Sequence, residues 1–222
     1  MWLTAFLLLF GLGVSWALTN PPLVNPDEPA HAVKATALWR GQVLPPKQPL
    51  PDLGPGSLIR GAFTTNVTVP GSYGVQTAKD PECFIWDSRI PAGCMPGWVD
   101  DPAPTAWTSY IGRYPPTYYA FLGWTTRVDT GLKGFYAMRF VSAALDAALL
   151  ATAFVMARMA ARFRYLAMAI LLACTPEVLQ LAGSINPNGL EIAAGVLAWT
   201  SVSVAVLWTG PSIPRQVLAA AA

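Results

Sequence analysis

Four apolar segments constrain the fold of this chain more than any other feature. They cover residues 2–18, 135–156, 165–182 and 190–208. An α-helix rises about 1.5 Å per residue, so roughly 17 to 25 apolar residues cross the hydrocarbon core of a bilayer. Only 12% of the residues are charged, against about 25% in soluble domains. The sequence therefore predicts an all-α membrane protein, a polytopic helical bundle with one transmembrane helix at 1–18 and three more within 135–208.

Arginines set the expected orientation. Arg158, Arg162 and Arg164 lie in the short connection between the second and third segments, and short loops rich in arginine stay in the cytoplasm. By alternation, the amino terminus is cytoplasmic, residues 19–134 lie outside, and the chain is a multi-pass protein of the cell membrane. Residues 209–222 are expected to form a cytoplasmic tail or the start of a truncated fifth helix, which would make the chain the amino-terminal part of a longer protein.

The first segment has a second interpretation, a cleaved signal peptide. Ser15-Trp16-Ala17 resembles a cleavage site, but no lysine or arginine precedes the apolar run as it does in secretory signals. We therefore expect an uncleaved anchor.

The long outer segment, 19–134, is rich in proline and in aromatic residues. Proline at this density excludes long helices, and the aromatic residues exclude a simple flexible linker. We expect a small ordered extracytoplasmic cap with short strands around 62–69. Cys83 and Cys94 lie in it and are candidates for a disulfide bond, because an outer compartment is oxidising.

Charge and cysteine usage exclude two classes of site. The formal net charge of +2 is small and is not gathered into a basic stripe, so no nucleic-acid partner is expected. Three cysteines and one histidine match no metal-ligand spacing, so no metal site is predicted from them.

Polar residues that could carry chemistry follow the first segment directly, in the stretch Asn25-Pro26-Asp27-Glu28-Pro29-Ala30-His31. A juxtamembrane helix is predicted over 26–40, which places Asp27 and His31 one turn apart and Lys34 one turn further along. One interpretation is proton-transfer chemistry, with a carboxylate as general base and its neighbours orienting it or binding a phosphate. The other is ordinary helix capping by Asn25 or Asp27. The spacing alone leaves both open.

Two charged residues fall inside the second apolar segment. Arg139 and Asp146 are seven positions apart, about two turns, and so face the same side of a helix. Arg139 could hold a lipid phosphate or extend its charge to the interface. Asp146 is expected to pair with a neighbouring helix, the alternative being that it lines the same groove as Arg139.

Aromatic residues gather at the outer end of that segment. Tyr114, Tyr118, Tyr119 and Trp124 are expected mainly to anchor the chain at the membrane interface. Stacking on a sugar ring is the alternative for those that face the cap.

Three motifs in order resemble a known family. They are Pro22–Gly41 (PLVNPDEPAHAVKATALWRG), Tyr114–Tyr119 (YPPTYY) and Ser184–Leu190 (SINPNGL). They resemble elements of the domain-of-unknown-function 2142 family, bacterial multi-pass membrane proteins that are common in actinobacteria and related to the GT-C glycosyltransferases. Asn188 stands where that family usually has aspartate, which puts a role for this position in doubt.

The resemblance implies a function. GT-C enzymes transfer a sugar from a polyprenyl-phosphate-linked donor to an acceptor outside the membrane, here a cell-envelope glycan acceptor, with an acidic residue of the first outer loop as base. It implies Asp27 as general base, Glu28 as its support or as a ligand of a divalent cation, and His31 as a catalytic hydrogen-bonding partner. Lys34, Arg139, Tyr118 and Tyr119 are the candidate substrate-binding residues.

Three qualifications belong to this hypothesis. A truncated chain could hold the base and still be inactive. The rival is a non-catalytic polytopic membrane protein that binds envelope glycans or helps to export them. A transporter is a weaker third option, because no repeated halves are evident.

Overall fold

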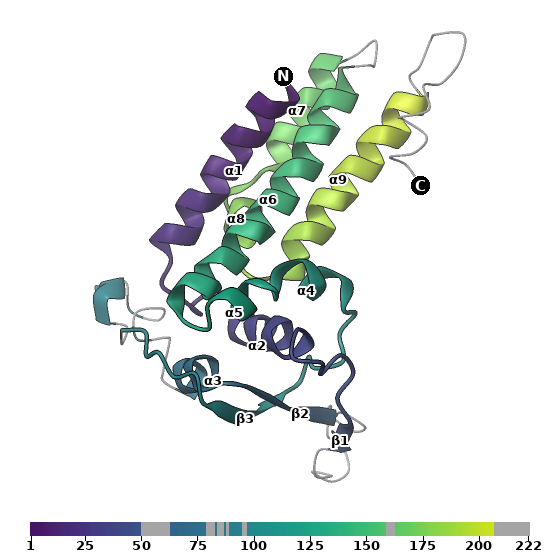
Figure 1. Cartoon of the computed structure of the whole chain (residues 1–222). Coiled ribbons are helices and arrows are strands. Elements are labelled where there is room, and N and C mark those ends of the chain that lie inside the picture. Colours follow the sequence, from purple (N-terminus) through teal and green to yellow (C-terminus); the bar gives the residue numbers. More distant parts are fainter. Residues whose placement is uncertain are drawn as a thin grey trace, which may run out of the picture. The chain divides into compact units, whose positions relative to one another are not determined.

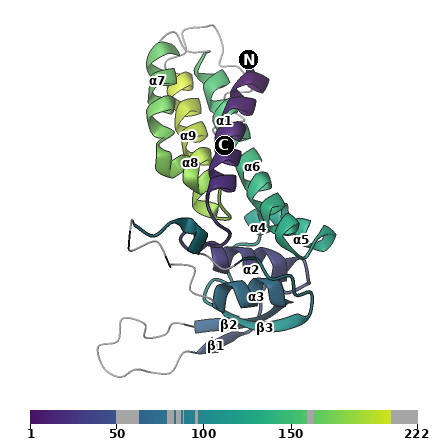
Figure 2. The ribbon, with the colours of Figure 1, turned by 90° about the vertical axis from the view of Figure 1, so that its left-hand side faces the viewer.

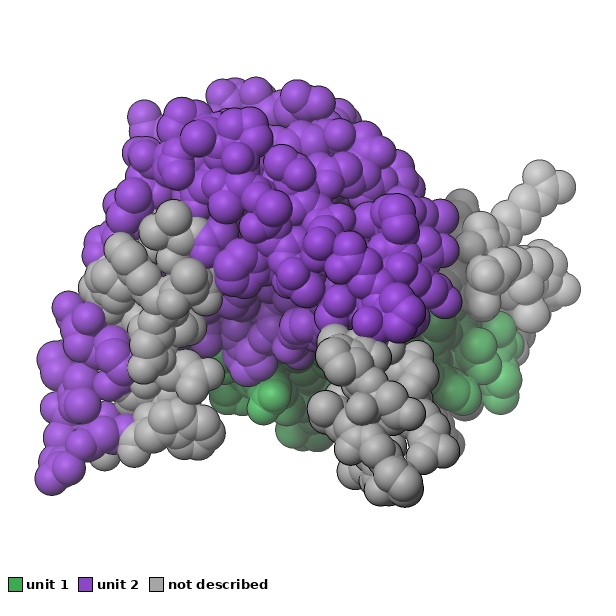
Figure 3. Space-filling view, turned by 90° about the horizontal axis from the view of Figure 1, so that it is seen from below, with its two compact units in different colours: residues 1–19, 139–222 green, residues 20–138 purple. Residues whose placement is uncertain are grey.

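The computed structural model describes residues 1–49, 63–78, 83, 87, 89–94, 97–158 and 163–206. The chain forms two compact units, which Figure 3 colours separately. Unit 1 comprises Met1–Thr19 and Arg139–Ala222, and unit 2 comprises Asn20–Met138. The predicted tail or fifth helix at 209–222 lies outside the described residues.

Unit 1 is helical. It contains α1 (Trp2–Thr19), the part of α6 (Leu132–Ala157) from Arg139 onward, α7 (Phe163–Ala173), α8 (Pro176–Ala182) and α9 (Pro187–Val206). The axes of helices α1, α6, α7 and α9 are roughly aligned (Figures 1 and 2). Three helices of the described chain, α1, α6 and α9, are long and apolar enough to cross a membrane. The prediction of a helical membrane protein is thereby supported, with three or four spans.

The fourth span depends on a broken helix. Residues 164–173 and 176–182 together pass the same test but are bent by 68°. Proline cannot continue the hydrogen-bond pattern of a helix and restricts the residue before it. Thr175, which precedes Pro176, is extended, and its hydroxyl accepts a hydrogen bond from the backbone N–H of Val178. The third apolar segment is therefore two helices rather than one.

Small residues bring the helices of unit 1 together. A Cβ on Gly13 of α1 would lie 3.0 Å from the Cβ of Ala143 on α6. A Cβ on Gly183, directly after α8, would lie 2.6 Å from the carbonyl oxygen of Gly13. Such close backbone approach is how membrane helices gain van der Waals contact. Leucine side chains of α1 point outward instead, at Leu3, Leu7, Leu8 and Leu12.

Unit 2 combines a sheet with short helices. Its elements are α2 (Glu28–Leu38), β1 (Lys47–Pro49), β2 (Phe63–Pro70), α3 (Gly71–Ala78), a 3₁₀ turn (Ala92–Cys94), β3 (Pro104–Ser109), α4 (Thr117–Leu122) and α5 (Thr125–Val128). The strands form an antiparallel sheet in the order β1-β2-β3. Thr65, Val67 and Val69 of β2 are buried, while Asn66 and Thr68 between them are exposed, as the alternation of a strand requires. The all-α description therefore fits unit 1 alone.

Helix α2 is the core of unit 2. It contacts α3, α4, β2 and β3, and Figure 1 shows it between α4 and the strands. Nine residues of this 11-residue helix are buried, and four of its residues are alanines, whose short side chains allow neighbours on every side. α2 covers most of the predicted segment 26–40, but it is enclosed all round rather than lying on a surface.

Candidate functional site

Asp27 stands in a strained turn at the start of α2. Its backbone is left-handed, with φ 59° and ψ −5°, a conformation that costs most non-glycine residues about 1–2 kcal/mol and that aspartate tolerates better than most. Backbone hydrogen bonds close this turn, from Glu28 N to Asn25 O (3.1 Å) and from His31 N to Asp27 O (3.0 Å). Such outliers cluster at functional sites.

The carboxylate of Asp27 does not cap the helix. It makes no side-chain capping hydrogen bond to α2. Instead, Oδ1 accepts a hydrogen bond of 2.5 Å from the hydroxyl of Tyr110, and Asp27 is exposed. The capping interpretation therefore does not describe this side chain, and Oδ2 accepts no hydrogen bond from the residues that the structure describes.

Glu28 has the opposite environment. It is fully buried, and its Oε2 accepts a hydrogen bond from Nδ2 of Asn25 at 3.3 Å. Two adjacent carboxylates thus differ in access, because Asp27 faces solvent and Glu28 faces the interior. Asp27 is the one accessible from solvent, and Glu28 is bonded to Asn25 inside the turn.

His31 is buried behind Asp27. Its Nδ1 lies 2.8 Å from the hydroxyl of Tyr119, and the two rings stack at 5.9 Å between centroids. Burial lowers the pKa of His31 from 6.5 to about 4, outweighing the attraction of Asp27 and Glu28. The imidazole is therefore neutral at pH 7 and shares one hydrogen bond with Tyr119.

Lys34 is directed away from Asp27. Its Nζ donates to the carbonyl oxygens of Val43 (2.7 Å) and Gly112 (2.6 Å). Burial lowers the pKa of Lys34, and the charge of Arg113 lowers it further. The ammonium joins two backbone segments, an arrangement that stabilises the fold.

The tyrosines divide between buried and exposed positions. Tyr118 and Tyr119 are buried, so the expected interfacial anchoring is wrong for them. Tyr114 and Trp124 are 46% and 44% exposed, which is compatible with that role. The ring of Tyr114 lies 6.2 Å from that of His31, so Tyr114 borders the site.

Tyr110 is the site residue that sequence reasoning missed. It directly follows β3 and is 56% exposed. Partial burial and the hydrogen bond and negative charge of Asp27 raise its pKa well above the usual value, so the phenol keeps its proton and remains a donor. Its place four residues before the Tyr-Pro-Pro motif was the available signal.

The charged residues of α6 belong to unit 1. Arg139 is buried, and its Nη1 donates to the carbonyl oxygen of Ala17 on α1 at 2.6 Å. The expected extension of Arg139 to the interface is therefore not what the structure has. Asp146 is also buried, and neither carboxyl oxygen has a hydrogen-bond partner among the described residues. The expected pairing of Asp146 with another helix is wrong.

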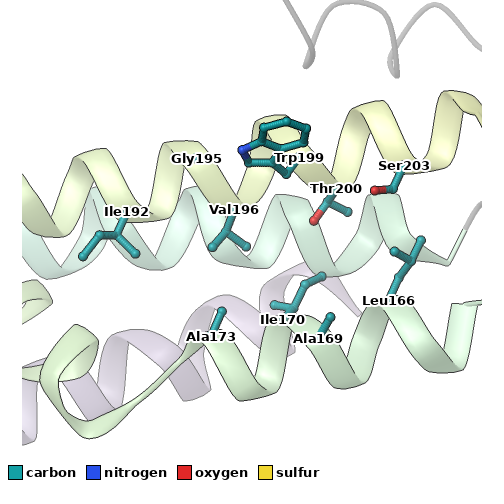
Figure 4. Close-up of a pocket in the computed structure, with 10 residues that line it drawn as sticks. All are labelled: Leu166, Ala169, Ile170, Ala173, Ile192, Gly195, Val196, Trp199, Thr200 and Ser203. Carbon is teal, nitrogen blue, oxygen red and sulfur yellow. The ribbon is translucent and has the colours of Figure 1, made fainter.

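An apolar groove lies between two helices of unit 1. Figure 4 shows the side chains that line it. Its volume is about 390 Å³. Helix α7 lines one wall and α9 the other, and Trp199 of α9 is 75% exposed. The full lining is Leu166, Ala169, Ile170, Ala173, Ile192, Gly195, Val196, Trp199, Thr200 and Ser203. This α7–α9 groove suits a hydrocarbon chain.

Two of the three cysteines are paired in the structure. Cys83 and Cys94 form a disulfide bond, and Cys174 is free. Across the described ranges, no three histidine, cysteine, aspartate or glutamate residues are grouped closely enough to hold a metal ion. The residues present therefore do not fit a divalent cation held by protein ligands alone.

Comparison with known proteins identifies the family. Residues 10–222 match the model of the family described as predicted membrane protein (DUF2142), and the chain belongs to that family. No curated protein and no solved structure matches the chain.

Proposed function

We propose that this membrane protein is a glycosyltransferase of the GT-C type that transfers a sugar from a polyprenyl-phosphate donor to a cell-envelope acceptor. The observation that carries the proposal is the exposed carboxylate of Asp27. It is held by Tyr110 through Oδ1, it stands in a left-handed turn, and it is backed by a buried neutral histidine. This arrangement presents one carboxylate oxygen to solvent in a fixed position, which is the geometry a general base needs.

In the proposed reaction, Asp27 is the base. The acceptor hydroxyl attacks the anomeric carbon of the donor sugar while Oδ2 of Asp27 takes its proton. The bond between that carbon and the phosphate oxygen breaks, and polyprenyl phosphate leaves with the bonding electrons. The proton on Asp27 then passes to water. Phosphate is a good leaving group, so the protein contributes mainly by orienting the acceptor and removing its proton.

The other site residues support Asp27. Tyr110 fixes its carboxylate, and Glu28 with Asn25 holds the turn from inside. His31 and Tyr119 form the buried wall behind it. Lys34 and Arg139 donate to backbone carbonyls, so neither side chain binds phosphate in the proposed mechanism.

Two further features support an envelope function. The α7–α9 groove offers an apolar surface for the isoprenoid chain of the donor. The disulfide between Cys83 and Cys94 suits a unit that lies outside the cytoplasm, in a multi-pass protein with its amino terminus inside.

Asp27→Asn tests the proposal. Asparagine keeps the shape and tolerates the left-handed turn but is not a base, so transfer from a radiolabelled polyprenyl-phosphate sugar should fall by about 10²- to 10⁴-fold. Asp87→Asn is the matched control, because Asp87 is paired with Arg89 and is not part of the proposed site, and it should leave transfer unchanged. Normal turnover by Asp27→Asn, inserted in membranes at the normal level, would refute the assignment.

Tyr110→Phe tests whether the tyrosine hydroxyl only positions the carboxylate of Asp27 or also acts on the substrate. It removes one hydroxyl and leaves Asp27 in place, so kcat should fall less than in Asp27→Asn. An effect equal to that of Asp27→Asn would mean that the tyrosine hydroxyl itself acts on the substrate.

The exposed rings of Tyr110 and Tyr114 favour one rival, a non-catalytic protein that binds envelope glycans by stacking. On that hypothesis, Tyr114→Ala would abolish glycan binding and Asp27→Asn would be silent.

A further inference from the structure

Asp146 is a carboxyl group inside the membrane-spanning unit that the proposed transfer reaction does not use. It lies near the middle of α6 and is 1% exposed. Neither Oδ1 nor Oδ2 receives a hydrogen bond from the part of the chain that the structure describes. Buried polar groups are nearly always hydrogen-bonded, and ionisable residues within membrane spans usually mark a function.

The surroundings of Asp146 are close-packed backbone. A Cβ on Gly189, in the first turn of α9, would lie 2.6 Å from Oδ2 of Asp146 and 3.1 Å from the carbonyl carbon of Leu181 at the end of α8. The carboxyl group therefore lies where the broken α7–α8 segment ends and α9 begins. It fits there because residue 189 has no side chain.

Within the described part of the chain, no cationic side chain is hydrogen-bonded to Asp146. Arg139, on its own helix, directs Nη1 to the carbonyl oxygen of Ala17. Helix α1 carries no ionisable side chain, and the acids of α8 and α9, Glu177 and Glu191, are exposed. The ion pair between Arg89 and Asp87 lies in unit 2 and does not involve Asp146.

These contacts decide between the two forms of the carboxyl group. An ionised carboxylate in a water-poor site without a cation or donor costs several kcal/mol, whereas the neutral acid carries no net charge. A cation held by protein ligands would need several oxygen ligands, and the described residues group no second acid with Asp146.

We propose that Asp146 is a proton-binding site within unit 1. Its carboxyl group holds a proton at neutral pH and releases it at high pH. Binding is simple protonation, in which a hydronium ion gives its proton to a carboxylate oxygen and leaves as water. The site is independent of sugar transfer, because it does not involve Asp27.

Infrared spectroscopy tests the proposal without a reagent that must enter the site. The full chain in lipid vesicles at pH 7 is compared with Asp146→Asn, which is nearly isosteric. The difference spectrum should contain the carbonyl stretch of one protonated carboxyl group, and this band should shift in D₂O. Glu191→Gln is the control and should lack the band, since Glu191 is exposed to solvent. Carboxylate bands in place of the acid band for Asp146 would overturn the proposal.

Labelling with dicyclohexylcarbodiimide, an apolar reagent for protonated carboxyl groups, gives a second measurement. Modification of Asp146, followed by mass spectrometry of its peptide, should be at least tenfold greater at pH 6 than at high pH and should be unaffected by sodium chloride. Protection by sodium at constant ionic strength would identify a cation site and overturn the proton assignment. Neither result depends on Asp27, so both should be the same in Asp27→Asn.

Discussion

Acidification should weaken unit 2 through a single side chain. His31 is the one histidine of the chain, and burial lowers its pKa from 6.5 to about 4. Between these values, the unfolded chain binds more protons than the folded chain. The stability that His31 contributes is therefore complete above pH 6.5 and is lost as the pH falls toward 4.

The size of the effect follows from the two pKa values. At pH 5, an unfolded histidine is almost fully protonated and the folded one is almost fully neutral, which lowers the free energy of unfolding by about 2 kcal/mol relative to pH 7.5. The full shift corresponds to about 3 kcal/mol. Most aspartate and glutamate side chains remain ionised at pH 5, so the effect of the histidine is separable from theirs.

Two measurements check this prediction in detergent micelles. The imidazole resonance of the only histidine, followed by NMR in the full chain, should titrate near pH 4. Denaturant unfolding followed by tryptophan fluorescence should lose about 2 kcal/mol between pH 7.5 and pH 5 in the wild type. His31→Gln keeps a polar partner for Tyr119 but takes no proton, so its loss should be much smaller.

Asp27→Asn gives an internal check of the electrostatics. The negative charge of Asp27 raises the pKa of His31, so removing that charge should move the titration of His31 to still lower pH. A histidine that titrates near 6.5, or an equal acid sensitivity in the wild type and His31→Gln, would refute the reasoning.

Three further predictions concern stability and substrate access. Lys34→Met should lower the free energy of unfolding by about 1–3 kcal/mol, because it leaves the buried carbonyl of Gly112 without its hydrogen-bond donor. The KM for the sugar donor should not change. A raised KM at normal stability would instead indicate that Lys34 binds the phosphate. Cys83 and Cys94 are 11 residues apart, so reduction of their disulfide should lower the free energy of unfolding by about 3 kcal/mol through loop entropy. Protein alkylated after reduction should be heavier by two labels than protein alkylated without reductant, while Cys174 reacts alike in both samples. Gly195→Leu should fill the α7–α9 groove, where a Cβ meets no atom within 4 Å, and slow transfer from long-chain donors more than from short-chain ones. Gly11→Leu, on α1 and equally open, is its control, and an equal effect of both would exclude the groove as the lipid site.

The membrane helices were predictable because their signal is local. Apolar length located α1, α6 and α9, whereas the third apolar segment, expected as one helix, is bent at a break before Pro176. Each of these inferences depends only on neighbouring residues, since a helix satisfies its own backbone hydrogen bonds.

The candidate site was only half predictable. Asp27, Glu28 and His31 are adjacent in the sequence, but Tyr110 is 83 residues from Asp27, and its position depends on the pairing of β3 with β2, where Ser109 lies opposite Thr65. A sequence shows charge but not the partner of that charge. Lys34 and Arg139 therefore resembled phosphate ligands, and the structure adds that each donates to at least one backbone carbonyl.

The enclosure of α2 also limits how the site can open. A helix with neighbours on every side can neither roll nor slide without disrupting the core, so the backbone of Asp27 and His31 is held in place. The connection from β3 to α4, which carries Tyr110 and Tyr114, is also held: Lys34 donates to the carbonyl oxygen of Gly112, and Arg113 donates to that of Pro45. The side chains of Tyr110 and Tyr114 are exposed, so they are the parts of this connection that can change rotamer without disrupting the core.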